Sequence, residues 1–170
     1  DNGTGQVVLD VAPLFESVAA LDAAGSTLGR LLADPIYRDH LAARGNRQVV
    51  MIGYADSNKE SGIASSRWLL RKAQEAMLAA CEGAGVRLLV FHGRGGSISR
   101  GGSRTEAVVS SLPSAVASGQ LRVTEQGETV SFKYGLPGLA YRNLEAALAA
   151  TLLAAFPEVA GSRPPDSARE

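Results

Sequence analysis

The stretch that decides the fold is Val49-Val50-Met51-Ile52-Gly53-Tyr54, an almost unbroken apolar run. A second run of this kind, Arg87-Leu88-Leu89-Val90-Phe91, follows it. Short runs that are apolar at successive positions are typical of strands buried on both faces of a parallel sheet. Between them, residues 60–81 repeat apolar side chains at helical spacing, and Gly83 and Gly85 follow as stop signals. This region predicts a strand, a helix and a second parallel strand, with Trp68 and Cys81 of the helix in the core.

Further strands and helices are predicted on either side of this unit. Residues 7–11 and 121–124 are expected to form strands, and residues 17–32 and 144–156 helices. Such consecutive βα units predict an α/β fold, either a doubly wound sheet or part of a (β/α)₈ barrel. A whole barrel needs about 250 residues, so four units would make half of one. Residues 157–170, rich in proline, serine and charge, are expected to be a flexible tail or linker after a domain over residues 1–156.

Composition excludes several classes of protein. The 170 residues include 17 basic and 17 acidic side chains, which argues against a wholly basic nucleic-acid-binding surface. The single cysteine excludes an intramolecular disulfide framework, and two histidines cannot build a three-histidine metal site. The longest apolar stretch, Ala146 to Phe156, is too short to span a membrane, and no secretory signal opens the chain. We therefore expect a cytoplasmic protein without nucleic-acid or membrane partners, and the missing initiator methionine suggests that it belongs to a longer chain.

Ionisable side chains follow the first three predicted strands, where α/β folds place their chemistry. Glu16 and Asp56 could share a divalent cation, because Mg²⁺ commonly takes one or two carboxylates and completes its shell with water or substrate oxygens. Each could instead be an N-cap or first-turn acid of a helix. Lys59 could contact a substrate or simply pair with Asp56.

The strongest signal is the glycine-rich loop Gly93-Arg94-Gly95-Gly96-Ser97-Ile98-Ser99-Arg100-Gly101-Gly102. Glycines allow close approach of backbone N–H groups to an anion, and Arg94 and Arg100 add donors suited to phosphate or carboxylate. A Ser103-x-x-Glu106 capping box predicts a helix start directly after the loop, which favours anion binding. The loop lacks the lysine of a Walker A motif and the third glycine of the dinucleotide pattern. An RGG-type RNA tether is the remaining alternative.

His92 immediately precedes this loop. A lone histidine is more often structural than catalytic, but its place at a strand end beside two arginines favours a functional role. The nearby positive charge is expected to lower its pKa and keep it neutral near pH 7.

These residues lie in motifs that resemble the phosphoenolpyruvate carboxylase family. Residues 50–62, V-M-I-G-Y-A-D-S-N-K-E-S-G, are similar to the family's V-M-x-G-Y-S-D-S-x-K-D-x-G. Residues 91–102, F-H-G-R-G-G-S-I-S-R-G-G, are similar to its F-H-G-R-G-G-S-I-G-R-G-G. The resemblance extends in order from Pro13-Leu14-Phe15-Glu16 through residues 119–128 and 132–137, and covers roughly residues 7–156. Ala55, Glu60 and Ser99 depart from the family's serine, aspartate and glycine.

The resemblance implies a lyase that adds bicarbonate to phosphoenolpyruvate, through carboxyphosphate and an enolate, to give oxaloacetate and phosphate. It implies a cytoplasmic homotetramer built on a (β/α)₈ barrel, an anaplerotic role feeding the tricarboxylic acid cycle, and inhibition by a dicarboxylate such as aspartate.

The resemblance also implies roles for single residues. It places Mg²⁺ or Mn²⁺ on Glu16 and Asp56, and puts His92, Arg94, Arg100 and Lys59 among the catalytic residues. Gly93, Arg94, Gly95 and Gly96 would bind the phosphate.

The family's N-terminal T-A-H-P-T-E-type motif is absent from the sequence. We therefore expect an internal fragment, about half a barrel, with little or no turnover alone. The alternative is a non-catalytic phosphate-binding or anion-binding module that needs no metal.

Overall fold

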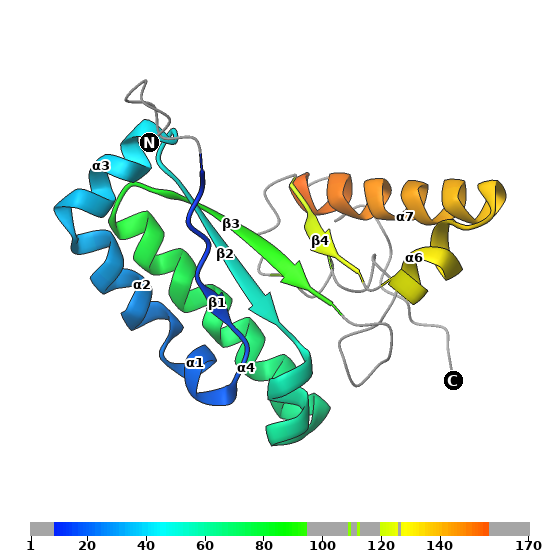
Figure 1. Ribbon diagram of the computed structural model, residues 1–170, viewed down its shortest axis with the longest axis horizontal. Coiled ribbons are helices and arrows are strands. Elements are labelled where there is room, and N and C mark those ends of the chain that lie inside the picture. The colour runs from blue at the N-terminus through cyan, green and yellow to red at the C-terminus, as the bar shows by residue number, and fades with distance from the viewer. Residues whose placement is uncertain (1–8, 95–108, 110–111, 113–119, 126, 157–170) are drawn as a thin grey trace.

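A computed structural model describes residues 9–94, 109, 112, 120–125 and 127–156 of the chain. Within them, four parallel strands form one sheet in the order in which they occur in the sequence (Figure 1). They are β1 (Leu14–Phe15), β2 (Arg47–Gly53), β3 (Arg87–Gly93) and β4 (Arg122–Thr124). Gly53 and Gly93 are register partners at the carboxyl ends of the two central strands. The predicted α/β class with a parallel sheet is confirmed.

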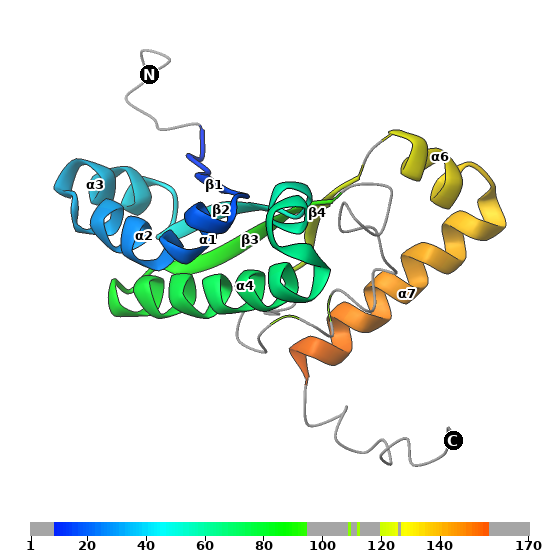
Figure 2. The ribbon, with the colours of Figure 1, turned by 90° about the horizontal axis from the view of Figure 1, so that it is seen from below.

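Helices cover one face of this sheet (Figure 2). They are α1 (Val18–Asp22), α2 (Ala24–Ala33), α3 (Pro35–Ala43) and α4 (Ala55–Gly83). The hydrophobic core forms between them and the strands, where Val50 and Val90 pack with Leu28, Met77 and Cys81. Cys81 is fully buried, as expected.

Trp68, in contrast, is 67% exposed, so its predicted place in the core is wrong. The side chains of α4 that are buried toward the sheet are Leu70, Ala73, Met77 and Cys81, which recur every three or four residues. Trp68 lies outside this stripe, and apolar character alone did not distinguish the two faces of the helix.

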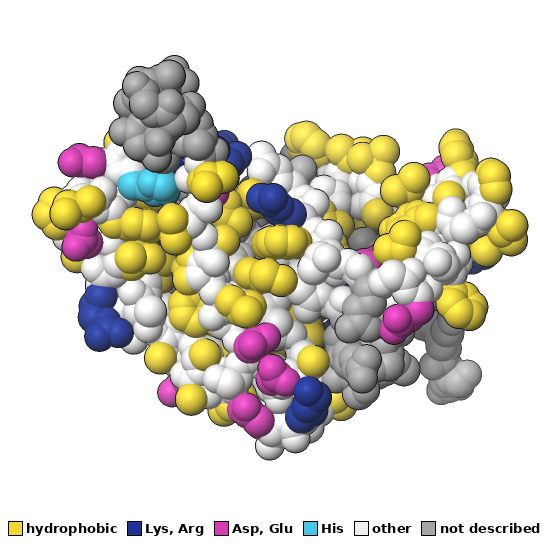
Figure 3. Space-filling model, in the orientation of Figure 1, with side chains coloured by type: hydrophobic (Ala, Val, Ile, Leu, Met, Phe, Trp, Pro, Cys, Tyr) yellow, Lys and Arg dark blue, Asp and Glu magenta, His cyan; other side chains and the backbone are white. Residues whose placement is uncertain are grey.

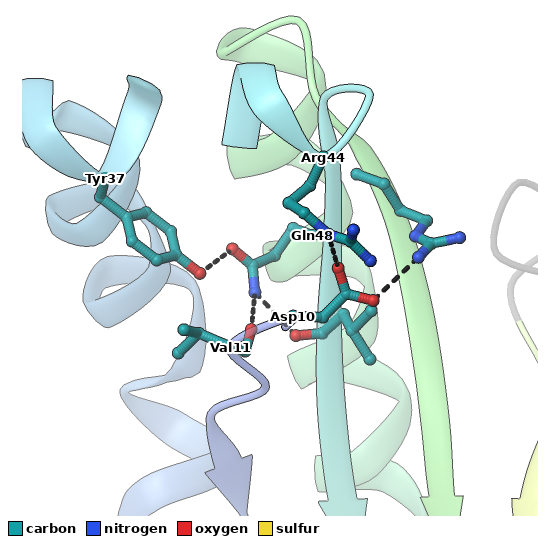
Figure 4. A network of polar contacts seen from close by, with 7 residues as sticks. Asp10, Val11, Tyr37, Arg44 and Gln48 are labelled. Carbon is teal, nitrogen blue, oxygen red and sulfur yellow. Dashed lines mark hydrogen bonds and ion pairs between the residues drawn. The ribbon is translucent and has the colours of Figure 1, made fainter. Parts of the chain in front are cut away.

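The predicted strand at residues 7–11 is also wrong over the residues that the structure describes. Residues 9–13 have no regular secondary structure, and β1 begins only at Leu14. The segment still runs beside β2, because the fully buried Gln48 holds it there (Figure 4). The Gln48 Nε2 atom donates to the carbonyl oxygens of Val11 (3.1 Å) and Val49 (2.7 Å), and Oε1 accepts from the Tyr37 hydroxyl (2.7 Å).

Asp10 adds an ion-pair cluster to the same end of the sheet (Figure 4). Its carboxylate lies 2.8 Å from Arg44 Nε and 2.8 Å from Arg47 Nη2. The hydrogen bonds from Arg44 and Arg47 hold the pKa of Asp10 below its usual value. Side-chain contacts therefore anchor this segment in place of the strand pairing expected from its apolar residues.

The remaining helices differ in detail from their predicted bounds. The predicted helix over residues 17–32 is divided into α1 and α2, and the helix predicted from residue 144 begins earlier, as α7 (Pro137–Ala155). Proline is favoured in the first turn of a helix, which accounts for that start. Helices α3 and α6 (Gly127–Tyr134) were not predicted. No described helix has the length and apolarity needed to cross a bilayer, and the predicted tail at residues 157–170 lies outside the described residues.

The opposite face of the sheet carries apolar side chains that the described helices leave partly open. Met51, Leu89 and Phe91 are half-buried and Leu14 is 47% exposed. Figure 3 shows hydrophobic side chains gathered over the strands on this face. Figures 1 and 2 show α7 standing apart from the helices that cover the sheet.

Candidate active site at the strand ends

The carboxyl ends of the strands enclose a cleft of about 260 Å³. Because the strands are parallel, the segments that follow them gather at one edge of the sheet. The cleft is lined by residues from the ends of all four strands, among them Glu16, Gly53, Tyr54, Gly93, Arg94 and Glu125. Three of the predicted site residues, Glu16, Gly93 and Arg94, therefore line one hollow.

Glu16 lies directly over the end of β2, and Gly53 makes this possible. A Cβ atom on residue 53 would lie 2.6 Å from the Glu16 Cβ atom and 3.0 Å from its Oε2 atom. Any larger side chain would displace Glu16, because carbon atoms in contact lie about 3.5–4.0 Å apart. The glycine that ends β2 thus sets the position of one predicted metal ligand.

The backbone brings Asp56 next to Glu16. The Ser57 backbone N–H donates to the Glu16 carbonyl oxygen at 3.0 Å, so the first turn of α4 rests on the residue that follows β1. Asp56 occupies that turn, and its side chain is 42% exposed. Asp56 is not among the residues that line the cleft. The two predicted metal ligands are neighbours at the strand ends, with Glu16 inside the cleft and Asp56 beside it.

Lys59 pairs with Asp56, as one of the two interpretations of this lysine predicted. The Lys59 Nζ atom lies 2.9 Å from Asp56 Oδ1, and the lysine side chain is 69% exposed. Exposed ion pairs contribute about 0–1 kcal/mol, so this one could open at little cost. Among the described residues no three histidine, cysteine or acidic side chains form a metal-binding group. Two accessible carboxylates nevertheless fit Mg²⁺, which completes its shell with water and substrate oxygens.

Glu60 and Gly62 hold the short helical segment that bears Asp56. The Glu60 carboxylate accepts a hydrogen bond of 2.7 Å from the Val18 backbone N–H, at the start of α1. Gly62 then interrupts α4 with φ 77° and ψ 164°, a conformation that is essentially restricted to glycine. Residues 55–61 therefore form a separate helical segment, tied to the loop that carries Glu16.

His92 lies beneath the cleft. It is 1% exposed, shares a strand face with Val90, and its Nδ1 atom lies 2.9 Å from the Tyr54 hydroxyl oxygen. Burial and, to a smaller extent, the positive charge of Arg94 together lower the pKa of His92 to about 4. His92 is therefore neutral near pH 7, as predicted, although burial and not the arginine is the larger cause.

Arg94 extends from the end of β3 into the cleft wall. It is 5% exposed, and its backbone N–H donates to the Thr124 carbonyl oxygen of β4 at 3.2 Å. Its guanidinium carbon lies 5.7 Å from the centre of the Tyr54 ring, within the range of a cation–π contact. Burial lowers the pKa of Arg94, but a guanidinium remains charged in proteins.

Two ionisable residues of the cleft, Tyr54 and Glu125, were not predicted as site residues. Tyr54 contacts both His92 and Arg94, and its only signal in the sequence was its place at the end of an apolar run. Burial raises the pKa of Tyr54 to about 12, so its hydroxyl keeps its proton. Glu125 follows β4, lines the cleft and pairs with Lys133. The predicted residues Gly95, Gly96 and Arg100, and the capping box at residues 103–106, lie outside the described part of the chain.

Comparison of the sequence with known proteins shows which family the chain resembles. A family model described as phosphoenolpyruvate carboxylase matches residues 1–166. The phosphoenolpyruvate carboxylase of Xanthomonas oryzae pv. oryzae is 52% identical over 155 residues, which are 91% of this chain and 17% of that protein. The enzymes of Corynebacterium glutamicum and Nocardia farcinica are 45% and 42% identical over 159 residues each, 94% of this chain and 17% of each enzyme.

The chain thus spans about a sixth of the curated relatives that it matches. The match runs through both motifs, V-M-I-G-Y-A-D-S at residues 50–57 and F-H-G-R-G-G at residues 91–96, whose described residues lie at or next to the ends of β2 and β3. Since the family model covers nearly the whole chain, the chain belongs to the phosphoenolpyruvate carboxylase family, of which it represents a segment.

Proposed function

We propose that this chain carries the metal-binding and phosphate-binding part of a phosphoenolpyruvate carboxylase active site. In the complete enzyme the site would join bicarbonate to phosphoenolpyruvate and release oxaloacetate and phosphate. The observation that carries the proposal is the meeting of Glu16 and Arg94 in one cleft, with Asp56 held next to Glu16. Carboxylates for a cation and a guanidinium for a phosphate are what a metal-assisted reaction of a phosphate ester requires.

Half of a (β/α)₈ barrel accounts best for the fold. The parallel strands follow one another in sequence order, as barrel strands do, and described helices cover one face. The other face carries half-buried apolar side chains, which suit the interior of a closed barrel. The rest of the longer enzyme would supply the remaining strands and close both edges of the sheet.

Glu16 and Asp56 would hold the Mg²⁺ or Mn²⁺ ion. Once bound, the ion would supply positive charge that stabilises the negative oxygens of the substrate during the reaction. The short helical segment at residues 55–61 and Gly53 keep the two carboxylates in place. Lys59 would leave Asp56 when the ion binds and become available to the substrate.

Arg94 would bind the phosphate group with its forked donors, together with the backbone N–H groups of Gly93, Gly95 and Gly96 and with Arg100. Its burial against Tyr54 excludes water from part of its surface, which strengthens its attraction for an anion. His92 is neutral, hence it would act through hydrogen bonds and not as a cation. A dicarboxylate such as aspartate could inhibit by engaging the same arginines, and homotetramer assembly would depend on the complete chain.

A non-catalytic anion-binding module is the second candidate. The buried guanidinium of Arg94 would serve that function equally well, without a cation. The dependence of binding on a divalent metal separates the two candidates.

Calorimetric titration with Mn²⁺ tests the proposed function. The wild-type chain should bind saturably, and Asp56→Asn should abolish the binding while circular dichroism shows an unchanged fold. Asp22→Asn is the matched control, because Asp22 also faces an exposed lysine, Lys72, at 3.8 Å, but lies away from the strand ends. Equal Mn²⁺ binding by the wild type and Asp56→Asn, or a folded wild type that binds no Mn²⁺, would contradict the proposal.

A further inference from the structure

Tyr54 links the strand that bears the phosphate-binding loop to the helix that bears Asp56. It follows β2 directly, precedes α4, and is 5% exposed. One side of this residue faces the 260 Å³ cleft at the strand ends. Another side faces a second cavity of about 390 Å³ that is lined by α4 residues, including Arg67 and Gln74. Tyr54 also packs in the hydrophobic core, and with cavities beside it, specific contacts add to that packing in holding the side chain in one orientation.

Two contacts from β3 meet this ring. The Tyr54 hydroxyl oxygen lies 2.9 Å from His92 Nδ1, and both side chains are buried. The Arg94 guanidinium carbon lies 5.7 Å from the ring centre. The hydroxyl group fixes the far end of the ring, and the ring face receives the guanidinium of Arg94, which directly follows β3.

The direction of the hydrogen bond fixes the state of His92. A neutral imidazole carries one proton, and the nitrogen without it accepts hydrogen bonds. A tyrosine hydroxyl can donate to Nδ1 only when the imidazole proton is on Nε2. Burial keeps His92 neutral, so that one of its two ring nitrogens is available as an acceptor.

We propose that Tyr54 is a positioning residue: its hydroxyl donates to His92 Nδ1, and the ring held in this way orients the Arg94 guanidinium for a phosphate in the cleft. The phosphate part rests on the proposed function. The hydrogen bond and the orientation of Arg94 are independent of the proposed function, because both can be measured on the chain without a ligand.

The tautomer of His92 is the first measurement. The chain contains only two histidines, and the second, His40, stacks on Tyr37 with ring centres 5.6 Å apart. Nitrogen-15 NMR of the full chain should show His92 as the Nε2–H tautomer. Tyr54→Phe should introduce the Nδ1–H form, whereas the matched variant Tyr37→Phe should leave His92 unchanged. A wild-type Nδ1–H tautomer, or a His92 spectrum that Tyr54→Phe does not change, would overturn the proposal.

The order of the Arg94 side chain is the second measurement. Relaxation of its Nε–H group should report a restricted side chain in the wild type, intermediate mobility in Tyr54→Phe, and mobility like that of the exposed Arg87 in Tyr54→Leu. The dissociation constant for inorganic phosphate should rise about 2- to 30-fold in Tyr54→Leu, the range that a lost cation–π contact covers. An Arg94 that stays equally ordered in both variants would overturn the proposal. An ordered Arg94 and the expected tautomer in a chain that binds no phosphate would support the positioning and count against the proposed function.

Discussion

Gly53→Ala is the sharpest test of how the fold positions the predicted metal ligands. The new methyl group would start 2.6 Å from the Glu16 Cβ atom, and this atom cannot swing away as the tip of a long side chain could. Glu16 would have to retreat by about 1 Å to reach the ordinary contact distance of about 3.5 Å. Such overpacking costs about 1–3 kcal/mol, and replacing a strand glycine with alanine returns about 0.5–1 kcal/mol. We therefore expect a net loss of up to about 2.5 kcal/mol, centred on about 1 kcal/mol, in the free energy of unfolding.

The effect on Mn²⁺ affinity should exceed what this loss of stability implies. Disturbing a group that orients a metal ligand typically weakens metal binding about 10- to 100-fold, and we expect a loss in this range. Urea denaturation and calorimetry measure the two quantities. Gly29→Ala in α2 is the control, because, apart from the adjacent residues and backbone of its own helix, no described atom lies within 4 Å of its new Cβ atom. It should gain about 0.5–1 kcal/mol and bind Mn²⁺ normally. Wild-type Mn²⁺ affinity in a folded Gly53→Ala chain would refute the reasoning.

Three further changes test other parts of the structure. Gly62→Ala should lower the free energy of unfolding, measured by urea denaturation, by about 1–3 kcal/mol, because φ 77° and ψ 164° suit only glycine. An unchanged urea midpoint would show that the break in α4 does not depend on this glycine. The pKa of His92 is about 4 in the folded chain, against an ordinary value of 6.5. As the pH falls, the unfolded chain therefore takes up this proton before the folded chain does. The free energy of unfolding should fall by about 3 kcal/mol between about pH 6.5 and pH 4. His92→Gln should flatten that part of the pH profile, and a profile unchanged by this substitution would contradict the buried, neutral state. Gln48→Leu should lose about 1–3 kcal/mol by leaving the Tyr37 hydroxyl and the Val11 carbonyl unpaired, whereas wild-type thermal stability would mean that water replaces the amide.

The sequence predicted the strands β2, β3 and β4 well and the edge formed by β1 poorly, for physical reasons. Val50 and Val90 pack against the helices, and Met51, Leu89 and Phe91 on the other face of the same strands are half-buried, so continuous apolar runs identified these strands. Residues 7–11 show a similar run, but a buried glutamine side chain and an ion-pair cluster, not strand pairing, determine how residues 9–11 are held. The helix that begins at Pro35 did have a signal, since Asp34 caps it by accepting from the Tyr37 N–H.

The candidate site likewise was predicted where a general pattern applied and missed where a long-range side-chain contact decides. The predicted proximity of Glu16 and Asp56 came from the general geometry of parallel strands, which place their carboxyl ends together. Tyr54 was missed because its partner His92 lies 38 residues away in sequence, and no local pattern reports such a contact. Residue type and position at a strand end can suggest a site, but the hydrogen bond that orients it is a property of the packed structure.

The binding of phosphoenolpyruvate to this chain, measured by calorimetry with and without Mn²⁺, tests the central claim most directly. We propose that Glu16, Asp56 and Arg94 form one site at the strand ends, and on this proposal the substrate should bind far more tightly with Mn²⁺ present. Asp56→Asn should remove the dependence on metal, and Arg94→Lys should weaken binding, because lysine lacks the forked donors of arginine. Equal phosphoenolpyruvate affinity with and without Mn²⁺ would contradict the account and identify the cleft as an anion-binding site that works without a metal.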